Sequence, residues 1–90
     1  MIGLEYICNL YNKSYNSVAE ELGISRQSIN GWVKGLRPIP KKHLPKLSNI
    51  FDGVYKEYFQ KELTEIDKIN IQKTKVFNEC RHLGLTLEEL

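Results

Sequence analysis

Acidic residues are missing from one long stretch of this 90-residue sequence. No Asp or Glu occurs between Leu22 and Ile50, although Lys and Arg are frequent there. These basic residues are Arg26, Lys34, Arg37, Lys41, Lys42 and Lys46. The net charge of the whole chain is only +2, because acidic residues elsewhere offset these basic residues. The positive excess is therefore concentrated in this one stretch. Such a distribution indicates a surface that binds a polyanion.

Other absences each exclude a class of protein. Ninety residues form one small core, too little for separate substrate and cofactor domains, and no catalytic set of residues occurs, so we expect neither an enzyme nor a cofactor. Cys8 and Cys80 lie far apart without a metal or redox motif, and His43 and His82 are isolated. No apolar run of about 18 residues and no secretion signal occurs, so we expect a cytoplasmic protein without a membrane segment.

Two short helices are predicted at the start of the chain. The first runs from about Leu4 to Lys13 and has apolar residues at i, i+3, i+4 and i+7. They are Leu4, Ile7, Cys8 and Tyr11. Ser14 is the expected N-cap of the second helix, and Gly23 ends it because glycine tolerates a left-handed backbone. The apolar face of the second helix consists of Val18, Ala19 and Leu22.

A third helix is predicted to begin after an N-cap at Ser25 and to end at Gly35. Its buried stripe consists of Ile29, Trp32 and Val33. Pro38 and Pro40 keep the next connection extended.

A fourth helix is predicted from about Lys41 to Phe51, with Pro45 in its first turn. Its inward positions are Leu44, Leu47, Ile50 and Phe51. Asp52-Gly53 then predicts a turn.

The last third of the chain has helical spacing from Tyr55 to Leu83. An unbroken helix of this length would measure about 40 Å, too long to pack entirely on a small bundle. Residues 70–75 fit the pattern least well and are an alternative break point. Residues 86–89 have the form of a capping box for a final helical turn. The expected class is all-α: a compact four- to five-helix bundle with a long C-terminal helix.

Residues 18–32 fulfil the demands of a helix-turn-helix. Ala19 is small where two helices cross, Gly23 lies in the turn, and apolar residues anchor the second helix from beneath. The chain here resembles the helix-turn-helix domain of phage repressors and Cro-like regulators, the xenobiotic-response-element (XRE) family. Trp32, Gly35, a following proline and a later Gly then Tyr-Phe segment extend the resemblance to about Leu4–Phe59. We therefore expect a DNA-binding domain over 1–59 and a helical extension over 60–90.

The resemblance implies which residues contact double-stranded DNA. Ser25, Arg26, Gln27 and Ser28 would lie at the major groove, where Arg pairs with guanine and Gln with adenine. Relatives often have a base-reading side chain four residues after Gln27, whereas this chain has Gly31. That departure either narrows the readout to the helix N-terminus or lets the helix approach the bases more closely.

Phosphate contacts are implied for a second set of residues. They are Asn30, Lys34, Arg37, Lys41 and Lys42, with Ser14 and Tyr15 as a clamp at the start of the other motif helix. The alternative for each lysine is an ordinary solvated surface charge. Trp32 lies beneath its helix, so we interpret it as a core residue and not as a stacking platform.

The C-terminal extension has an apolar stripe that predicts a homodimer. The stripe consists of Phe59, Leu63, Ile66, Ile69, Val76, Phe77 and Leu83. Two copies could pair through it in an antiparallel or crossed manner, and the alternative is that the helix folds back on its own bundle. A dimer would place two reading helices about 34 Å apart, one DNA turn.

The sequence thus predicts a dimeric transcriptional regulator, a phage-type repressor on an inverted-repeat operator. A protein-interaction module on the same scaffold, antitoxin-like or anti-repressor, is the main alternative, with the C-terminal helix holding a protein partner. A recombination or replication accessory protein that binds DNA is a third.

Overall fold

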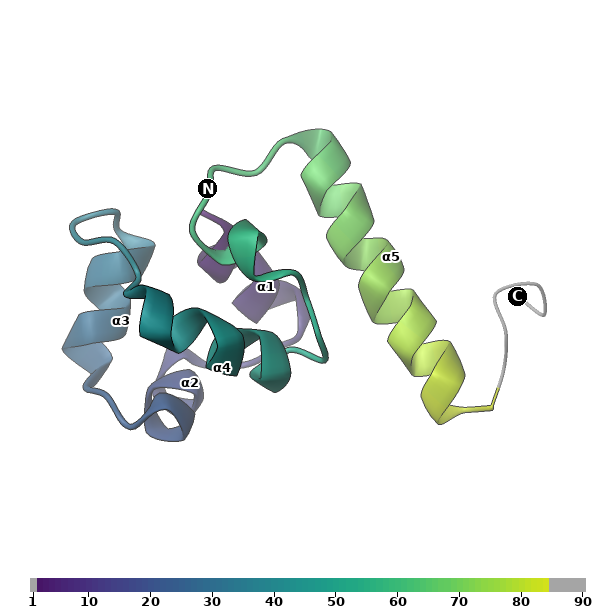
Figure 1. The fold of residues 1–90 in the computed structure, drawn as a ribbon, viewed down its shortest axis with the longest axis horizontal. Coiled ribbons are helices and arrows are strands. Elements are labelled where there is room, and N and C mark those ends of the chain that lie inside the picture. Colours follow the sequence, from purple (N-terminus) through teal and green to yellow (C-terminus); the bar gives the residue numbers. More distant parts are fainter. Residues whose placement is uncertain (1, 85–90) are drawn as a thin grey trace.

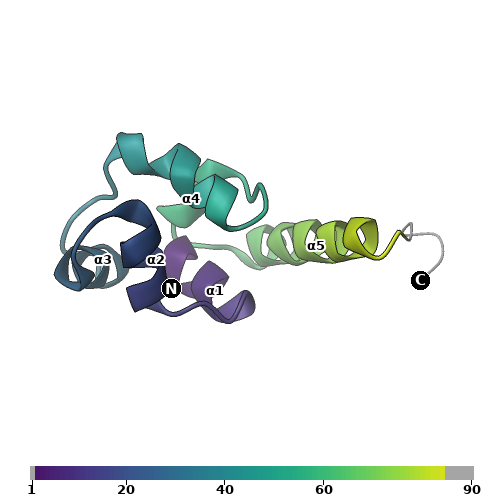
Figure 2. The ribbon, with the colours of Figure 1, turned by 90° about the horizontal axis from the view of Figure 1, so that it is seen from below.

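The computed structural model describes residues 2–84, and the regular elements of this part of the chain are helices joined by loops. Its elements are α1 (Gly3–Leu10), α2 (Tyr15–Leu22), α3 (Arg26–Val33), η1 (Lys41–His43), α4 (Leu44–Ile50), η2 (Lys56–Phe59) and α5 (Glu65–His82), where η marks a short 3-10 helix. Helices α1 to α4 surround one core, and α3 and α5 lie at opposite ends of the molecule (Figures 1 and 2). The expected all-α class is confirmed. The predicted turn at 86–89 lies outside the described residues.

The two motif helices have the predicted boundaries. Ser14 Oγ accepts a hydrogen bond from the Ser17 N–H at 3.1 Å, and Ser25 Oγ accepts one from the Ser28 N–H at 3.2 Å. Each N-cap thereby satisfies a backbone donor that has no partner within its helix. Gly23 has a φ of +72°, which turns the chain from α2 towards α3. The sequence-based prediction of two capped helices joined by a glycine turn is confirmed.

Helices α1 and α4 differ in detail from the prediction. α1 ends at Leu10 and not at Lys13, because Asn12 adopts a left-handed φ of 54° and the Lys13 N–H turns back to the Cys8 carbonyl at 2.9 Å. The predicted helix over residues 41–51 is divided into the 3-10 turn η1 and the α-helix α4. Pro45 lies in the first turn of α4, as expected, where its missing N–H is not needed.

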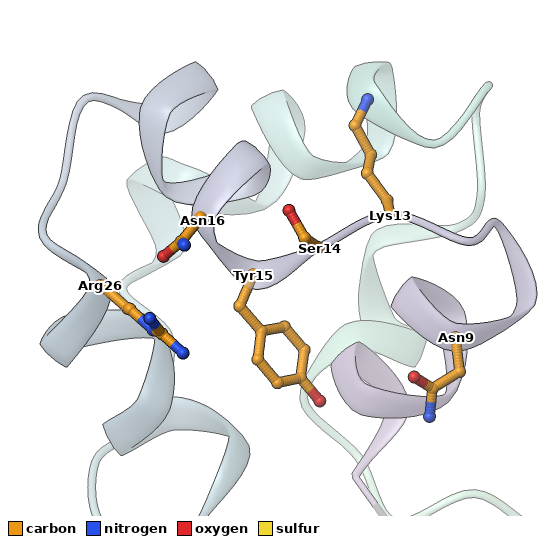
Figure 3. Close-up of a pocket in the computed structure, with 6 residues that line it drawn as sticks. All are labelled: Asn9, Lys13, Ser14, Tyr15, Asn16 and Arg26. Carbon is orange, nitrogen blue, oxygen red and sulfur yellow. The ribbon is translucent and has the colours of Figure 1, made fainter.

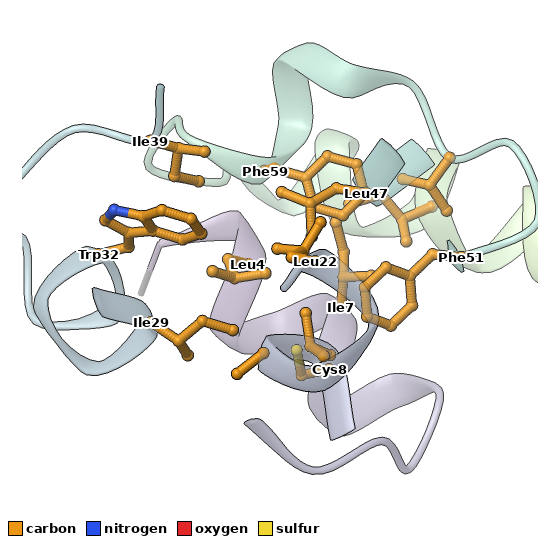
Figure 4. Close-up of a cluster of buried hydrophobic side chains, with 14 residues drawn as sticks. Leu4, Ile7, Cys8, Leu22, Ile29, Trp32, Ile39, Leu47, Phe51 and Phe59 are labelled. Atoms are coloured by element: carbon orange, nitrogen blue, oxygen red, sulfur yellow. The ribbon is translucent and has the colours of Figure 1, made fainter. Parts of the chain in front are cut away.

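The core lies between α1, α2, α3, α4 and η2 (Figure 4). Trp32 is only 4% exposed and packs beside Ile39, so its predicted core role is confirmed. Cys8 is also buried, and the loss of hydration raises the pKa of its thiol to about 12. The thiol therefore stays protonated and packs as an apolar group. Cys80 is buried as well, but it lies outside this core cluster.

The helical spacing over residues 55–83 corresponds to two helices and not to one, because the chain leaves the helical path between Phe59 and Glu65. The break is not at 70–75, which lies inside α5. Thr64 caps α5 with a complete capping box, in which the Asp67 carboxylate accepts from the Thr64 N–H at 3.0 Å. Lys61 pairs with the same carboxylate at 2.9 Å. These capping interactions therefore stabilise the start of a new helix at this point.

The break is also fixed by the N-terminus of the chain. The Gly3 N–H donates to the Lys61 carbonyl at 3.0 Å, and Ile2 forms an antiparallel bridge with Glu62. A Cβ atom on Gly3 would overlap the Tyr58 carbonyl oxygen, so only glycine lets α1 begin this close to η2. Segments far apart in sequence thus hold residues 60–64 in an extended path.

Helix α5 turns a mostly polar side towards the bundle. Ile71 is fully buried in the core, and Gln72 Nε2 donates to Tyr6 Oη at 2.7 Å. Further along the helix, Asn78 Nδ2 donates to the Asp52 carbonyl at 2.8 Å. The apolar stripe predicted to pair with a second copy therefore faces away from the bundle over most of its length, and the helix rests on α1 mainly through polar groups.

Candidate nucleic-acid interface

The outward side of α3 is set by the helical repeat. Ile29 and Trp32 point into the core, so Gln27, Asn30 and Gly31 lie on the opposite side of the helix. Lys34 follows on the same side and is exposed. Three further basic residues of the acid-free run, Arg37, Lys41 and Lys42, are exposed on the segment that follows α3.

The positive charge of this surface is not neutralised within residues 2–84. The ion pairs there join Lys13 to Glu21, Lys61 to Asp67, Lys68 to Glu65 and Lys75 to Glu79. Each of these carboxylates lies outside the acid-free run. The cations on α3 and on the following loop are therefore available to an external anion.

The residues at the start of α3 differ in their freedom to contact a base. Gln27 is exposed. Ser28 is partly buried, and its hydroxyl lies 3.1 Å from that of Ser25, so these two side chains are engaged with each other. Arg26 is exposed and extends towards the start of α2 (Figure 3). Gln27 is thus the least engaged of the predicted base-reading side chains.

Arg37 lies against α3 itself. Its guanidinium covers Gly31, where a Cβ atom would lie 3.0 Å from Nε and from Nη2. Nη2 is 3.5 Å from the Gln27 carbonyl, a long hydrogen bond. The Gly31 carbonyl accepts from the Leu36 N–H at 2.9 Å, which folds the loop back over the helix. Gly31 is consequently buried although it lies on the outward side of α3.

A polar hollow of about 300 Å³ lies where α1, α2 and α3 meet (Figure 3). It is lined by Asn9, Lys13, Ser14, Tyr15, Asn16 and Arg26. The structure thus brings together three predicted contact residues, Ser14, Tyr15 and Arg26. In Figure 3 the Lys13 side chain points away from the other five, and its ammonium pairs with Glu21 at 3.1 Å.

The groups in this hollow are mostly donors. The N–H groups in the first turn of α2 have no partner within the helix, apart from the one capped by Ser14. Burial raises the pKa of the Tyr15 phenol, with smaller contributions from Glu5 and Cys8, so the phenol keeps its proton. Together with the Arg26 guanidinium, these donors suit an oxyanion such as a phosphate.

Three residues that line this hollow were not predicted from the sequence: Asn9, Asn16 and Lys13, whose side chain points away from the others. Asn16 follows the N-cap by two residues, a position beside the exposed N–H groups of a first turn, which is a signal that could have indicated it. Asn9 on α1 carries no such signal, because only the packing of α1 against α2 brings it there.

The predicted dimerisation residues divide into two groups. Phe59 is fully buried in the core and Leu63 is partly buried against it, so these two residues cannot line an exposed stripe. The other members remain exposed on α5 or just beyond it, at 39% to 74%. They are Ile66, Ile69, Val76, Phe77 and Leu83, and we refer to them as the α5 stripe.

Two capped helices joined by a glycine turn, with the second helix on a basic surface, define the class of helix-turn-helix proteins. A sequence model of the helix-turn-helix family matches residues 4–59 of the chain. The chain therefore belongs to this family, in its XRE and Cro-like branch, and is a DNA-binding helix-turn-helix regulator. Comparisons with curated proteins and with solved structures found no match.

The sequence predicts no membrane segment. Among residues 2–84, no helix is both long enough and apolar enough to span a bilayer.

Proposed function

We propose that this chain is a sequence-specific transcriptional regulator that places α3 in the major groove of double-stranded DNA and represses by occupying its operator, in the manner of phage-type repressors. One observation carries the proposal: the outward side of α3 presents Gln27 and Lys34 on a surface whose positive charge has no carboxylate partner within residues 2–84. A Gln amide can pair with adenine in two hydrogen bonds. Arg26 and Ser28 complete the reading set at the start of the helix.

The hollow beside the start of α2 is proposed as the main backbone clamp. A DNA phosphate there would accept from the first N–H groups of α2, the Ser14 hydroxyl and the Tyr15 phenol. Ser14 Oγ already accepts a hydrogen bond from the backbone, so its own proton remains free to donate. The clamp would fix the orientation of α3 in the groove.

A second group of phosphate contacts is proposed on the other side of α3. Asn30 lies on α3, Lys34 follows directly after this helix, and Lys41 and Lys42 lie on the exposed turn η1. Contacts to both flanks of the reading helix would straddle the major groove.

The partner proposed for the α5 stripe is a second copy of this chain. Apolar side chains fringe a shallow hollow of about 300 Å³ on α5, lined by Ile69, Gln72, Lys73 and Val76. α5 also has Glu65 in its first turn and Arg81 in its last turn. In an antiparallel pair of α5 helices these opposite charges would lie next to each other, which supports self-association. The chain would then act in two parts, reading DNA with 1–59 and associating with 60–90.

The position of α5 changes the kind of operator that we propose. Because α3 and α5 lie at opposite ends of the molecule, two copies joined by the α5 stripe would hold their α3 helices at the far ends of the pair (Figure 1). Such a pair suits two separate half-sites and not an inverted repeat with one-turn spacing. We therefore propose that each copy binds its own separate half-site.

A second candidate function is a protein-interaction module, and the exposed α5 stripe favours it. A partner protein could cover this stripe without approaching α3. In that case the stripe would bind a foreign helix, while the basic surface would have no base preference.

The first experiment is selection of bound duplexes from a randomised DNA pool at moderate salt, followed by sequencing. We expect enrichment of one short motif. Two inverted motifs spaced by one helical turn would instead show that copies associate through a surface other than α5. Salt-sensitive binding without enrichment, or no binding, would overturn the proposed function in favour of the interaction module.

A further inference from the structure

We propose that Arg37 is a base-reading residue. Because Gly31 has no side chain, the Arg37 guanidinium can lie against α3 and enter the major groove together with this helix. This inference rests on the proposed function, since it assigns a specificity role within the same DNA surface. The sequence alone had indicated a phosphate contact for Arg37, as for the lysines around it. The contacts of its side chain favour the different role.

The first observation is the direction of the Arg37 side chain. Arg37 follows the C-terminal end of α3, yet its Nη2 lies 3.5 Å from the carbonyl of Gln27, near the opposite end of the helix. The side chain therefore runs back along α3 to the level of the main predicted base reader. A phosphate contact at the edge of the groove would not need this path.

The second observation is the space that the guanidinium occupies. Gly31 lies one helical turn after Gln27 on the outward side of α3. A Cβ atom there would be 3.0 Å from Nε, 3.0 Å from Nη2 and 3.4 Å from Cζ of Arg37. The guanidinium thus lies directly against the position where an ordinary residue 31 would have its side chain, and this position faces the groove whenever Gln27 does.

The third observation is the fixed loop that brings Arg37 there. The Leu36 and Arg37 N–H groups both point to the Gly31 carbonyl, at 2.9 and 3.4 Å. The N–H of Ile39, two residues further on, is hydrogen-bonded to the Gln60 side chain. The backbone on both sides of Arg37 is therefore held in place, which reduces the entropy lost when its side chain contacts DNA.

The chemistry of the guanidinium then suggests what it reads. It has five N–H donors in a plane, and no carboxylate within residues 2–84 pairs with it. One donor is directed at the Gln27 carbonyl, so the others remain for DNA. Two parallel N–H donors match the O6 and N7 acceptors of guanine in the major groove. We infer a guanine next to the base pair that Gln27 contacts.

The test compares base preferences of four variants by the duplex selection described above and by competition binding. In Arg37→Ala and in Arg37→Lys, the preference for guanine at one position should fall by about tenfold to a hundredfold, because neither residue can form the paired contact. Lys34→Ala is the matched control. It should weaken binding to all sequences alike and keep every preference.

Gly31→Ala separates base reading from a simple charge effect. The new Cβ atom would lie 3.0 Å from Nε and Nη2, so the guanidinium has to shift from its position on α3 while Arg37 keeps its charge. The same guanine preference should therefore fall, and adding Arg37→Ala in this background should cause a smaller further loss at that position than Arg37→Ala causes in the unaltered protein. Circular dichroism would verify that the variant is folded, which we expect because alanine favours a helix more than glycine does.

Two results would overturn the inference, and they can be told apart. If Arg37→Ala and Gly31→Ala keep the guanine preference, Arg37 is a phosphate contact and the proposed function still stands. If the unaltered protein enriches no sequence at all, the proposed function and the role of Arg37 fail together.

Discussion

Gln27 is the side chain of α3 whose surroundings leave it most free to contact a base. It is exposed, whereas Ser28 is engaged with Ser25, and Arg26 extends towards the hollow at α2. A contact made by one amide should affect one base pair and leave the others unchanged. Substitutions of single residues therefore distinguish base-specific contacts from nonspecific electrostatic attraction most clearly.

Replacing Gln27 with Ala should relax the preference at one base pair at a cost of about 1 to 3 kcal/mol, because a two-bond contact to adenine is lost. Competition binding with duplexes that differ at single positions would measure the change. Gln72→Ala on α5 makes the same substitution at the other end of the molecule and should have no effect on binding. An equal loss on every duplex would remove Gln27 from the reading set.

Replacing Lys34 with Ala should flatten the dependence of log affinity on log salt by about one unit of slope, because one phosphate contact releases about one counterion. Titrations at several salt concentrations would give the slope. The exposed Lys73 on α5 supplies the control, since Lys73→Ala should leave the slope as it is. An unchanged slope in the Lys34 variant would identify its charge as an ordinary solvated one.

At the scale of the element, the join between η2 and α5 is held by the cap of α5 as well as by the N-terminus of the chain. Thr64 and Asp67 satisfy each other's backbone N–H groups, and Lys61 adds an ion pair to the same carboxylate. Beyond the cap, Ile71 is the residue of α5 that belongs to the core cluster. The first turn therefore has a large share in holding α5 on the bundle.

Thr64→Ala should lower the free energy of unfolding by about 1 kcal/mol, because it removes an N-cap. Chemical denaturation would measure the change, and amide hydrogen exchange should show the first turn of α5 opening most. Thr74→Ala, inside α5, is the matched control and should be close to neutral, since its hydroxyl bonds only to the Asn70 carbonyl of its own helix. Equal losses in both variants would argue against a special role for the cap.

The same cap predicts a pH dependence. The hydrogen bond from the Thr64 N–H, followed by that from Lys61, holds the pKa of Asp67 below its ordinary value of 3.8. Because the folded-state pKa is the lower one, this contribution is fully present above 3.8 and disappears as the pH falls through the folded-state value. Denaturation curves between neutral pH and strongly acidic pH should show a loss that Asp67→Asn abolishes. A variant with the same acid dependence as the parent would contradict this.

The individual helices show which features of the structure can be predicted from the sequence and which cannot. The caps at Ser14 and Ser25 and the turn at Gly23 follow from local chemistry, so α2 and α3 could be predicted closely. The break before α5 was missed because apolar spacing continues across it, although Thr64 and Asp67 three residues later were a local indication. The contact of Arg37 with Gly31 depends on how a loop folds back in space, which periodicity does not encode.

On the scale of the whole molecule, the reading helix and the apolar surface are separated. α3 and the α5 stripe lie at opposite ends (Figure 2), so a change on one surface should leave the other intact. This separation allows association and DNA binding to be tested independently.

Ile69→Asp should prevent self-association through α5, because it places a charge in the centre of the α5 stripe, where Ile69 is 53% exposed. Sedimentation should show a smaller species than the parent, while binding to a duplex with one half-site should persist. Asn49→Asp, at an exposed position on α4, adds the same charge outside the stripe and should not change the mass. If the Ile69 variant sediments like the parent, the second copy binds elsewhere.

The pairing of Gly31 with Arg37 has a consequence for how operator preference could change over generations. Most substitutions in a small domain reduce its stability, so a change of specificity usually has to be tolerated by the fold. Gly31→Ala is an exception, because it meets only the flexible end of one side chain and improves the helix by about 1 kcal/mol. A single-nucleotide mutation could therefore relax the operator preference of this protein without reducing the stability of its fold.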